Sequence, residues 1–244
     1  MRVPNKPKNY IAKVEWRNGQ PYASAFDDVY FSTDNGLLET DYVFLQGNHL
    51  QSRWQNLTAK NFTIAETGFG TGLNFLCAVK LWLETTPQDA ALHFISVEKY
   101  PLNLPDITAA LTMWPQLQGF SEPLLAQYVQ LISGVETITL FNNRIRLTIL
   151  IGDATERLSQ IENKIDAWFL DGFAPVKNPD MWQAVLFEEM ARLSYPTATF
   201  STFTSAGEVR RALIKAGFSV SKQTGFGKKR EMLIGHFVGN AHDT

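Results

Sequence analysis

A glycine-rich run between a short apolar segment and a helix-like one is the sharpest chemical signal in the sequence. It begins with Glu66, places glycines at Gly68, Gly70 and Gly72, and continues with Leu73. Glycines permit a tight turn and a close approach of the backbone to a bound group. A dinucleotide fingerprint would need glycine or alanine in place of Leu73, and the Gly-Lys-Ser/Thr of a phosphate-binding loop does not follow. The run favours a cofactor with a cationic, non-phosphate tail; a purely structural turn is the alternative.

Acidic residues end three of the segments that we expect to be strands. Glu66 ends the first, Glu98 ends the second, and Asp153 follows the third. Ligands of open α/β sheets bind at the carboxyl ends of the strands. There, Glu98 would accept hydrogen bonds from both hydroxyls of a ribose, and Asp153 would accept one from the amino group of adenine. The alternatives are an exposed charge at Glu98 and a helix N-cap at Asp153.

A fourth apolar segment ends in Asp171, Gly172, Phe173, Ala174 and Pro175. It is unusual for a strand to be followed directly by an acid, a glycine, an aromatic residue and, shortly after, a proline. The pair of Asp171 and Phe173 suits an amine on an aromatic base, because the ring can stack while the acid orients the nitrogen and balances its positive charge. A rigid turn capped by the aspartate is the alternative.

Other kinds of catalytic site find little support. The four histidines have no metal-ligand spacing, and the single cysteine, Cys77, excludes intrachain disulfides and cysteine-based zinc sites, so we expect no metal. No nucleophile elbow of the G-x-S-x-G kind is present.

Strand-like and helix-like segments alternate along the chain, which predicts a mostly parallel α/β sheet covered on both faces. The expected strands are 62–66, 92–98, 138–140, 145–151, 165–170 and 198–203, and the expected helices are 73–83, 101–114, 122–132, 179–193 and 205–216. Residues 218–224 and 231–238 flank a glycine turn and predict a C-terminal antiparallel hairpin. Residues 1–60 are rich in aromatic side chains and predict an N-terminal addition packed on a core domain of residues 61–244.

The composition is that of a folded protein that works in a reducing compartment. The chain has 244 residues, of which 45% are apolar, 12% aromatic and 19% charged. No apolar signal core opens the sequence and no stretch approaches the roughly 18 apolar residues of a membrane span. We therefore expect a cytoplasmic protein without a membrane partner.

The net charge of -2 conceals a strongly basic segment. Between residues 205 and 230, seven basic residues and one acid give a charge of +6, which leaves -8 for the rest of the chain. A solvated helix face and a charged turn are the plain explanation. A patch that binds nucleic-acid phosphates is the functional one.

Several of these motifs together resemble one family, the methyltransferase domain of the MnmC tRNA-modification proteins and their stand-alone relatives. The similar segments span nearly the whole chain and comprise 26–32, 66–76, 93–99, 166–175, 177–182, 202–207 and 225–233. Many methyltransferases share the glycine turn. The Asp-Gly-Phe-Ala-Pro and Gly-Phe-Gly-Lys-Lys-Arg-Glu-Met segments are far more particular.

The resemblance implies a Rossmann-like class I fold and an S-adenosylmethionine-dependent enzyme. Such an enzyme methylates the aminomethyl nitrogen of 5-aminomethyl-(2-thio)uridine at the tRNA wobble position. By the same resemblance, the cofactor-binding residues are Glu66, Gly68, Gly70, Gly72, Asn74, Glu98 and Asp153. Asp171 and Phe173 would stand at the amine. The anticodon arm would contact Arg210, Arg211, Lys228, Lys229 and Arg230.

Longer members of the family carry a C-terminal FAD-dependent oxidoreductase domain, and this chain has no second G-x-G-x-x-G unit. The sequence leaves open whether the chain is a stand-alone enzyme or one half of a bifunctional protein. Two other classes also stay open. One is an N-methyltransferase of a different amine, and the other is an RNA-binding module that holds the cofactor without catalysis.

Overall fold

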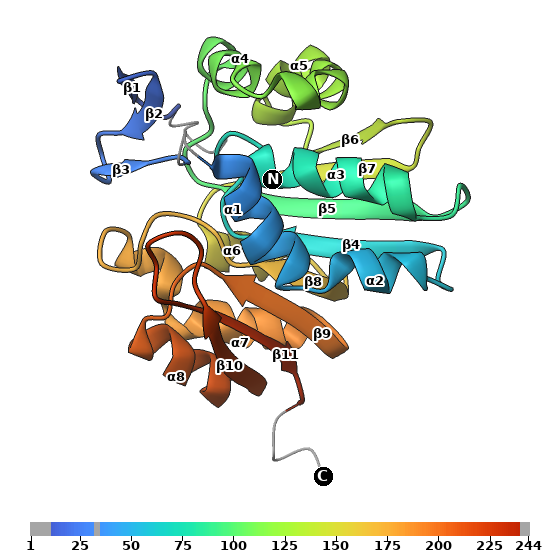
Figure 1. The fold of residues 1–244 in the computed structure, drawn as a ribbon, viewed down its shortest axis with the longest axis vertical. Coiled ribbons are helices and arrows are strands. Elements are labelled where there is room, and N and C mark those ends of the chain that lie inside the picture. The colour runs from blue at the N-terminus through green and yellow to red at the C-terminus, as the bar shows by residue number, and fades with distance from the viewer. Residues whose placement is uncertain (1–10, 32–34, 240–244) are drawn as a thin grey trace, which may run out of the picture.

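An eight-stranded sheet forms the centre of the computed structural model, which describes residues 11–31 and 35–239 (Figure 1). Its strand order is β10-β11-β9-β8-β4-β5-β7-β6. The strands are β4 (Asn61–Glu66), β5 (Ala91–Glu98), β6 (Thr137–Leu140), β7 (Ile145–Ile151), β8 (Ile165–Phe169), β9 (Ser194–Thr202), β10 (Phe218–Thr224) and β11 (Glu231–Phe237). The five strands from β9 to β7 are parallel, while β11 runs antiparallel to both β9 and β10. The predicted mostly parallel sheet with a C-terminal hairpin is confirmed.

Helices cover both faces of this sheet, as the alternating pattern predicts. They are α3 (Leu73–Thr85), α4 (Leu104–Thr112), η2 (Pro115–Leu117), α5 (Gln118–Ile132), α6 (Ala154–Leu158), η3 (Pro179–Trp182), α7 (Ala184–Leu193) and α8 (Gly207–Lys215). The apolar side chains of α3, α4 and α5 belong to one core cluster, and those of α6, α7 and α8 belong to a second. The two clusters lie on opposite faces of the sheet, so the central strands are buried on both sides.

The prediction of one continuous helix over 179–193 is wrong at its start. Pro179–Trp182 forms the short 3-10 turn η3, and Gln183 is extended before α7 begins. The indole nitrogen of Trp182 donates a hydrogen bond to the carbonyl oxygen of Phe173 at 3.0 Å. This bond ties the turn to the loop after β8, so a tertiary contact overrides the local helical pattern.

The N-terminal segment contributes a small sheet and three short helical elements. The sheet contains β1 (Val14–Arg17), β2 (Gln20–Ala23) and β3 (Asp28–Val29), and it is followed by α1 (Gly36–Thr40), the π-helix η1 (Asp41–Gln46) and α2 (Leu50–Gln55). Side chains from η1 and α2 join the core cluster of α3. Residues 1–10, part of the predicted addition, lie outside the described residues, and the division of the chain at residue 60 stays a prediction. None of the described helices is long and apolar enough to cross a membrane.

Asn48 fastens this segment to the main sheet through a fully buried amide. Its Nδ2 lies 3.2 Å from the carbonyl oxygen of Trp168 and 2.6 Å from Ser201 Oγ. Its Oδ1 accepts a hydrogen bond of 2.7 Å from Thr199 Oγ1. One side chain thus links the N-terminal helices to β8 and β9.

We expect Asn48→Ala to lower the free energy of unfolding by about 2–3 kcal/mol, because it leaves buried polar partners without a hydrogen bond. Urea denaturation monitored by circular dichroism measures this change. Asn56→Ala is the matched control, since Asn56 is exposed and makes a single 2.8 Å bond to the carbonyl oxygen of Ser52. Equal losses in the two variants would contradict the anchoring role of Asn48.

Candidate functional site

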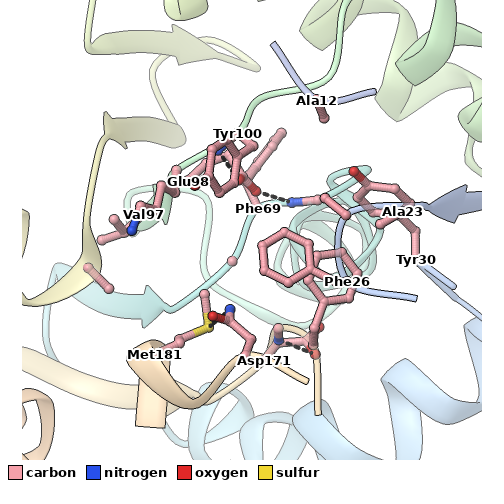
Figure 2. A pocket seen from close by; sticks show the side chains of 18 of the residues that line it. Ala12, Ala23, Phe26, Tyr30, Phe69, Val97, Glu98, Tyr100, Asp171 and Met181 are labelled. Carbon is pink, nitrogen blue, oxygen red and sulfur yellow. Dashed lines mark hydrogen bonds between the residues drawn. The ribbon is translucent and has the colours of Figure 1, made fainter. Parts of the chain in front are cut away.

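A cavity of about 530 Å³ opens at the carboxyl ends of β4, β5, β7 and β8 (Figure 2). The glycine-rich turn, the ends of β5 and β7, the loop after β8 and the N-terminal small sheet all contribute to its walls. Parallel strands bring these loops to one edge of the sheet, so residues far apart in the sequence meet there.

The glycine-rich turn shapes one wall. Gly68 and Gly70 line the cavity, whereas Gly72 is the N-cap of α3 and does not appear in the wall. Gly70 and Gly72 have φ values of 52° and 77°, in the left-handed region that favours glycine. A Cβ on Gly72 would lie 2.9 Å from Cζ of Phe69, and one on Gly68 would lie 3.4 Å from Cα of Gly172. Gly72 is therefore required both sterically and conformationally and Gly70 conformationally, whereas a Cβ on Gly68 would make only ordinary van der Waals contact.

Glu98 extends from the end of β5 into the cavity (Figure 2). Its Oε2 accepts a 2.9 Å hydrogen bond from the backbone N–H of Gly70, and its Oε1 accepts one of 2.7 Å from that of Tyr100. Burial raises the pKa of Glu98, and the backbone hydrogen bonds lower it in part. Because each oxygen uses one lone pair on the backbone, the carboxylate can still accept two more hydrogen bonds.

Asp153 lies beside Glu98 in the same wall, and the helix-cap interpretation is confirmed for it. Its Oδ1 accepts from the backbone N–H of Thr155 at 3.1 Å, and its Oδ2 lies 3.3 Å from Nζ of Lys99. Its side chain keeps 41% of its surface exposed. A cap of this kind leaves room for a further bond, so the adenine contact stays a prediction.

Asp171 lies in the cavity wall with both carboxylate oxygens held. Oδ1 accepts a 2.8 Å bond from the N–H of Gly172, and Oδ2 accepts one of 2.6 Å from Nδ2 of Asn74. The Thr67 hydroxyl also binds the carbonyl oxygen of Asp171 at 2.8 Å. Burial raises the pKa of Asp171 to about 6, against the lowering effect of these hydrogen bonds. The acid is thus fixed in position and largely ionised at neutral pH.

Glu66 is buried behind Asn74 and does not contribute to the cavity wall. Its oxygens accept hydrogen bonds of 2.9 Å from Nδ2 of Asn74 and 2.7 Å from the hydroxyl of Ser96. Burial raises the pKa of Glu66 to about 8, so the group is mostly protonated at pH 7. The predicted direct contact of Glu66 with a cofactor stays a prediction.

Phe173 does not present an open ring. Phe26 stacks on it with ring centroids 4.5 Å apart, and Tyr30 meets it edge-on at 5.6 Å. Phe26, Tyr30 and Met181 all line the cavity, and the site residues inferred from the sequence do not include them. Phe26 and Tyr30 fall within the segment 26–32 that resembles the MnmC family, and that segment is the signal that could have found them.

An ion pair also joins the loop that carries Phe173 to the N-terminal sheet. Nζ of Lys177 lies 3.5 Å from Oδ1 of Asp28 and donates to the carbonyl oxygen of Asp27. The small sheet therefore closes the side of the cavity that the main sheet leaves open.

The predicted RNA-binding residues are all exposed, but they occupy two elements. Arg210 and Arg211 lie on α8, whereas Lys228, Lys229 and Arg230 lie in the turn between β10 and β11. Among the residues described, only Lys229 of these five forms an ion pair, with Oε1 of Glu39 at 2.7 Å. Its ammonium group also lies 4.4 Å from the centre of the Phe203 ring.

The basic turn lies near the cavity. The charge of Lys229 lowers the pKa of Asp171, and that of Glu39 raises it. The hydroxyl of Tyr42 donates to the carbonyl oxygen of Thr224 at 2.9 Å, which holds η1 against the base of the same turn. The basic turn therefore lies close enough to Asp171 for its charge to act on that acid.

Comparisons with known proteins agree with this architecture. A family described as S-adenosyl-L-methionine-dependent methyltransferase matches residues 115–237. The tRNA 5-methylaminomethyl-2-thiouridine biosynthesis bifunctional protein MnmC of Methylobacillus flagellatus is 52% identical over 229 residues, which are 94% of this chain and 35% of that protein. The protein of the same name from Pseudomonas aeruginosa is 53% identical over 230 residues, with 93% and 35% covered.

Among solved structures, MNMC2 from Aquifex Aeolicus matches with a TM-score of 0.75 at 22% identity, covering 96% of this chain and 73% of that one. This likeness supports the fold. The chain spans about a third of the length of the two bifunctional relatives, 35% in each case. Since the family match covers half of the chain, including β7 and β8, two of the four strands that end at the cavity, the protein belongs to the S-adenosyl-L-methionine-dependent methyltransferases.

Proposed function

We propose that this chain transfers a methyl group from S-adenosylmethionine to the aminomethyl nitrogen of 5-aminomethyl-(2-thio)uridine at the wobble position of tRNA. One observation carries the choice of acceptor. Relatives named for 5-methylaminomethyl-2-thiouridine biosynthesis are more than 50% identical over more than nine-tenths of this chain. The site supports the proposal, because an acid suited to an amine lines the same cavity as an acid suited to a ribose.

The cavity fits S-adenosylmethionine in size and in the chemistry of its walls. Its volume of about 530 Å³ lies within the roughly 300–1,000 Å³ of small-molecule sites. Glu98 would accept from both ribose hydroxyls, and Asp153 from the amino group of adenine. The open backbone at Gly68 and Gly70 would admit the methionine part of the cofactor.

The bound cofactor supplies a methyl group already activated on a sulfonium, so the chain's own residues need only position and stabilise. The lone pair of a neutral amine forms the new nitrogen–carbon bond as the carbon–sulfur bond breaks, which leaves S-adenosylhomocysteine and a protonated secondary amine. Asp171 would orient the amine through an N–H hydrogen bond and stabilise the positive charge that develops on nitrogen. The excess proton then leaves to Asp171 or to water.

The proposed acceptor site also requires a surface for the base. A wobble base lies in a loop, where it can be turned out and stacked on an aromatic side chain. The cluster of Phe26, Tyr30 and Phe173 offers aromatic surface next to Asp171. We assign the base to this cluster as a whole, since Phe26 already covers one face of the Phe173 ring.

The basic turn would hold the phosphates of the anticodon arm. We expect the double variant Lys228→Gln, Arg230→Gln to raise the KM for tRNA more than it lowers kcat. The slope of log affinity against log salt concentration should become shallower by about 1.5, because each phosphate contact contributes roughly 0.7–0.9. Lys60→Gln is the control, since Lys60 is exposed and precedes β4 at the edge opposite the cavity. An unchanged salt slope would exclude the turn from tRNA binding.

The function is tested with labelled S-adenosylmethionine and two pools of tRNA. One pool carries 5-aminomethyl uridine at the wobble position, and the other is already fully methylated. We expect label only in the first pool. If label enters small amines or proteins but neither tRNA pool, the acceptor is not tRNA. Cofactor binding without any transfer would indicate a non-catalytic module.

The relatives are named bifunctional and are about three times as long as this chain, so we also propose that a longer parent chain carries a second catalytic domain, an FAD-dependent oxidoreductase. The same assay tests whether methyl transfer needs that domain. Transfer by this chain alone shows that it does not. Transfer that appears only on addition of the longer protein's second domain shows that it does.

A further inference from the structure

A chain of buried hydrogen bonds leads from α1 to the carboxylate of Asp171. The hydroxyl of Thr40, the last residue of α1, donates to Oδ1 of Asn74 at 2.9 Å. Nδ2 of Asn74 then donates to Oε1 of Glu66 at 2.9 Å and to Oδ2 of Asp171 at 2.6 Å. Thr40 and Asn74 are both buried, and Thr40 does not line the cavity.

We infer that Asn74 is a positioning residue for methyl transfer that acts through Asp171, and that Thr40 fixes the orientation of its amide. This inference rests on the proposed function, in which Asp171 stands at the amine. It departs from the prediction that Asn74 binds the cofactor, because both amide hydrogens and the amide oxygen already have protein partners.

An amide is the side chain that this position needs. Its two N–H groups point to two different carboxyl groups, so one planar group separates Glu66 from Asp171 and hydrogen-bonds to each. The amide is a neutral donor, so its N–H holds an ionised Asp171 in place without giving it a proton. The carboxylate thereby keeps its acceptor capacity for the substrate amine.

Thr40 decides which way the amide faces. An asparagine amide can rotate so that its oxygen and nitrogen exchange places. With the oxygen toward Asp171, two acceptors would face each other. The Thr40 hydroxyl adds to this preference, because it donates to Oδ1 when Nδ2 faces the acids. The N-terminal segment thereby contributes to the reactive site without touching it.

Three charged groups outside this network, Glu39, Lys229 and Glu98, act on its two acids. Glu39 on α1 raises the pKa of Asp171, and Lys229 in the β10–β11 turn lowers it. Asp171 and Glu98 both raise the pKa of Glu66. The hydrogen bond from Asn74 lowers the pKa of Asp171, so its loss should raise that pKa. The acid limb of the pH–rate profile, where activity is lost as Asp171 is protonated, should then lie at a higher pH.

The experiment compares Thr40→Val, Thr40→Ser and Asn74→Leu in the full chain, with labelled S-adenosylmethionine and 5-aminomethyl tRNA. We expect kcat to fall about 10-fold in Thr40→Val, the effect of one hydrogen bond, and about 100-fold in Asn74→Leu. In both Thr40→Val and Asn74→Leu, the acid limb should lie at a higher pH than in the parent. Thr40→Ser keeps the hydroxyl and should stay within about 2-fold of the parent.

Thr86→Val is the matched control, since Thr86 is also buried but lies at the far end of α3 and is not part of the site. It should leave kcat and the pH profile unchanged. Calorimetric titration of the cofactor and a thermal melt accompany each variant. Because Thr40 does not touch the cavity, its substitution separates positioning from direct cofactor contact.

Two outcomes would overturn the inference. One is weaker cofactor binding by Thr40→Val and Asn74→Leu with kcat unchanged at saturating cofactor. The other is an unchanged kcat and pH profile in both, while Asp171→Asn is inactive. If Asp171→Asn itself keeps full turnover, then the role proposed for Asp171 has failed, and that result is distinct from either of these.

Discussion

Replacing Asp171 with asparagine is expected to lower kcat by about 100- to 1,000-fold, while S-adenosylmethionine binds with nearly unchanged affinity. The substitution keeps the shape of the side chain but removes the charge that would stabilise the nitrogen in the transition state. The cofactor's ribose and adenine lie, in our proposal, against Glu98 and Asp153, which the variant leaves intact. Single-turnover methyl transfer and calorimetric titration of the cofactor measure the two effects.

The pH dependence offers an independent check on the same residue. Burial raises the pKa of Asp171 to about 6, so the active carboxylate is lost as the pH falls through that value. The parent protein should show an acid limb in kcat/KM near pH 6, and Asp171→Asn should lack it. A limb at the same pH in the variant would assign the titration to another group.

Unfolding does not account for the expected loss. A pKa that is higher in the folded state than in the unfolded one means that ionised Asp171 costs stability above about pH 6, and that the cost disappears below its unfolded value. Asp171→Asn removes that cost but leaves either the N–H of Gly172 or Nδ2 of Asn74 without its acceptor, so we expect it to melt close to the parent at pH 7. Equal losses of turnover and cofactor affinity would contradict the role at the amine and indicate a general defect of the site.

The second large effect is expected for cofactor binding. Glu98→Ala should raise the Kd of S-adenosylmethionine about 100-fold or more, because it removes the acceptor for two hydroxyls and leaves the N–H groups of Gly70 and Tyr100 without their partner. At saturating cofactor, kcat should fall much less. Isothermal titration with S-adenosylmethionine and with S-adenosylhomocysteine measures the affinity.

Glu162→Ala is the control for Glu98→Ala, since Glu162 is exposed in the loop before β8. Glu98→Gln should lie between the two, because its amide oxygen can still accept from one backbone N–H. An unchanged Kd in Glu98→Ala would show that the ribose does not bind at the end of β5. The cofactor would then have to occupy another position in the cavity.

The sheet and the edge at which the cavity lies follow from local patterns in the sequence. Apolar strands that alternate with helical segments must pair in parallel, and the acids and glycines that follow them must then meet at one edge. This reasoning brought Gly68, Gly70, Glu98, Asp153 and Asp171 together correctly, because each position depends on a strand end and its adjacent loop. The C-terminal hairpin follows from equally local signals, a glycine turn between two strand-like segments.

The side chains that surround those strand ends, in contrast, depend on long-range packing. Phe26 and Tyr30 lie more than 140 residues from Phe173 in the sequence, and nothing local predicts that their rings pack together. Likewise, Glu66 ends a strand as Glu98 does, yet it is covered by Asn74 and stays out of the cavity. Side-chain partners depend on the packing of the N-terminal segment against the sheet. Periodicity along one segment carries no information about such long-range contacts, which is why the hydrogen bonds that hold Asp171 became visible only in the folded chain.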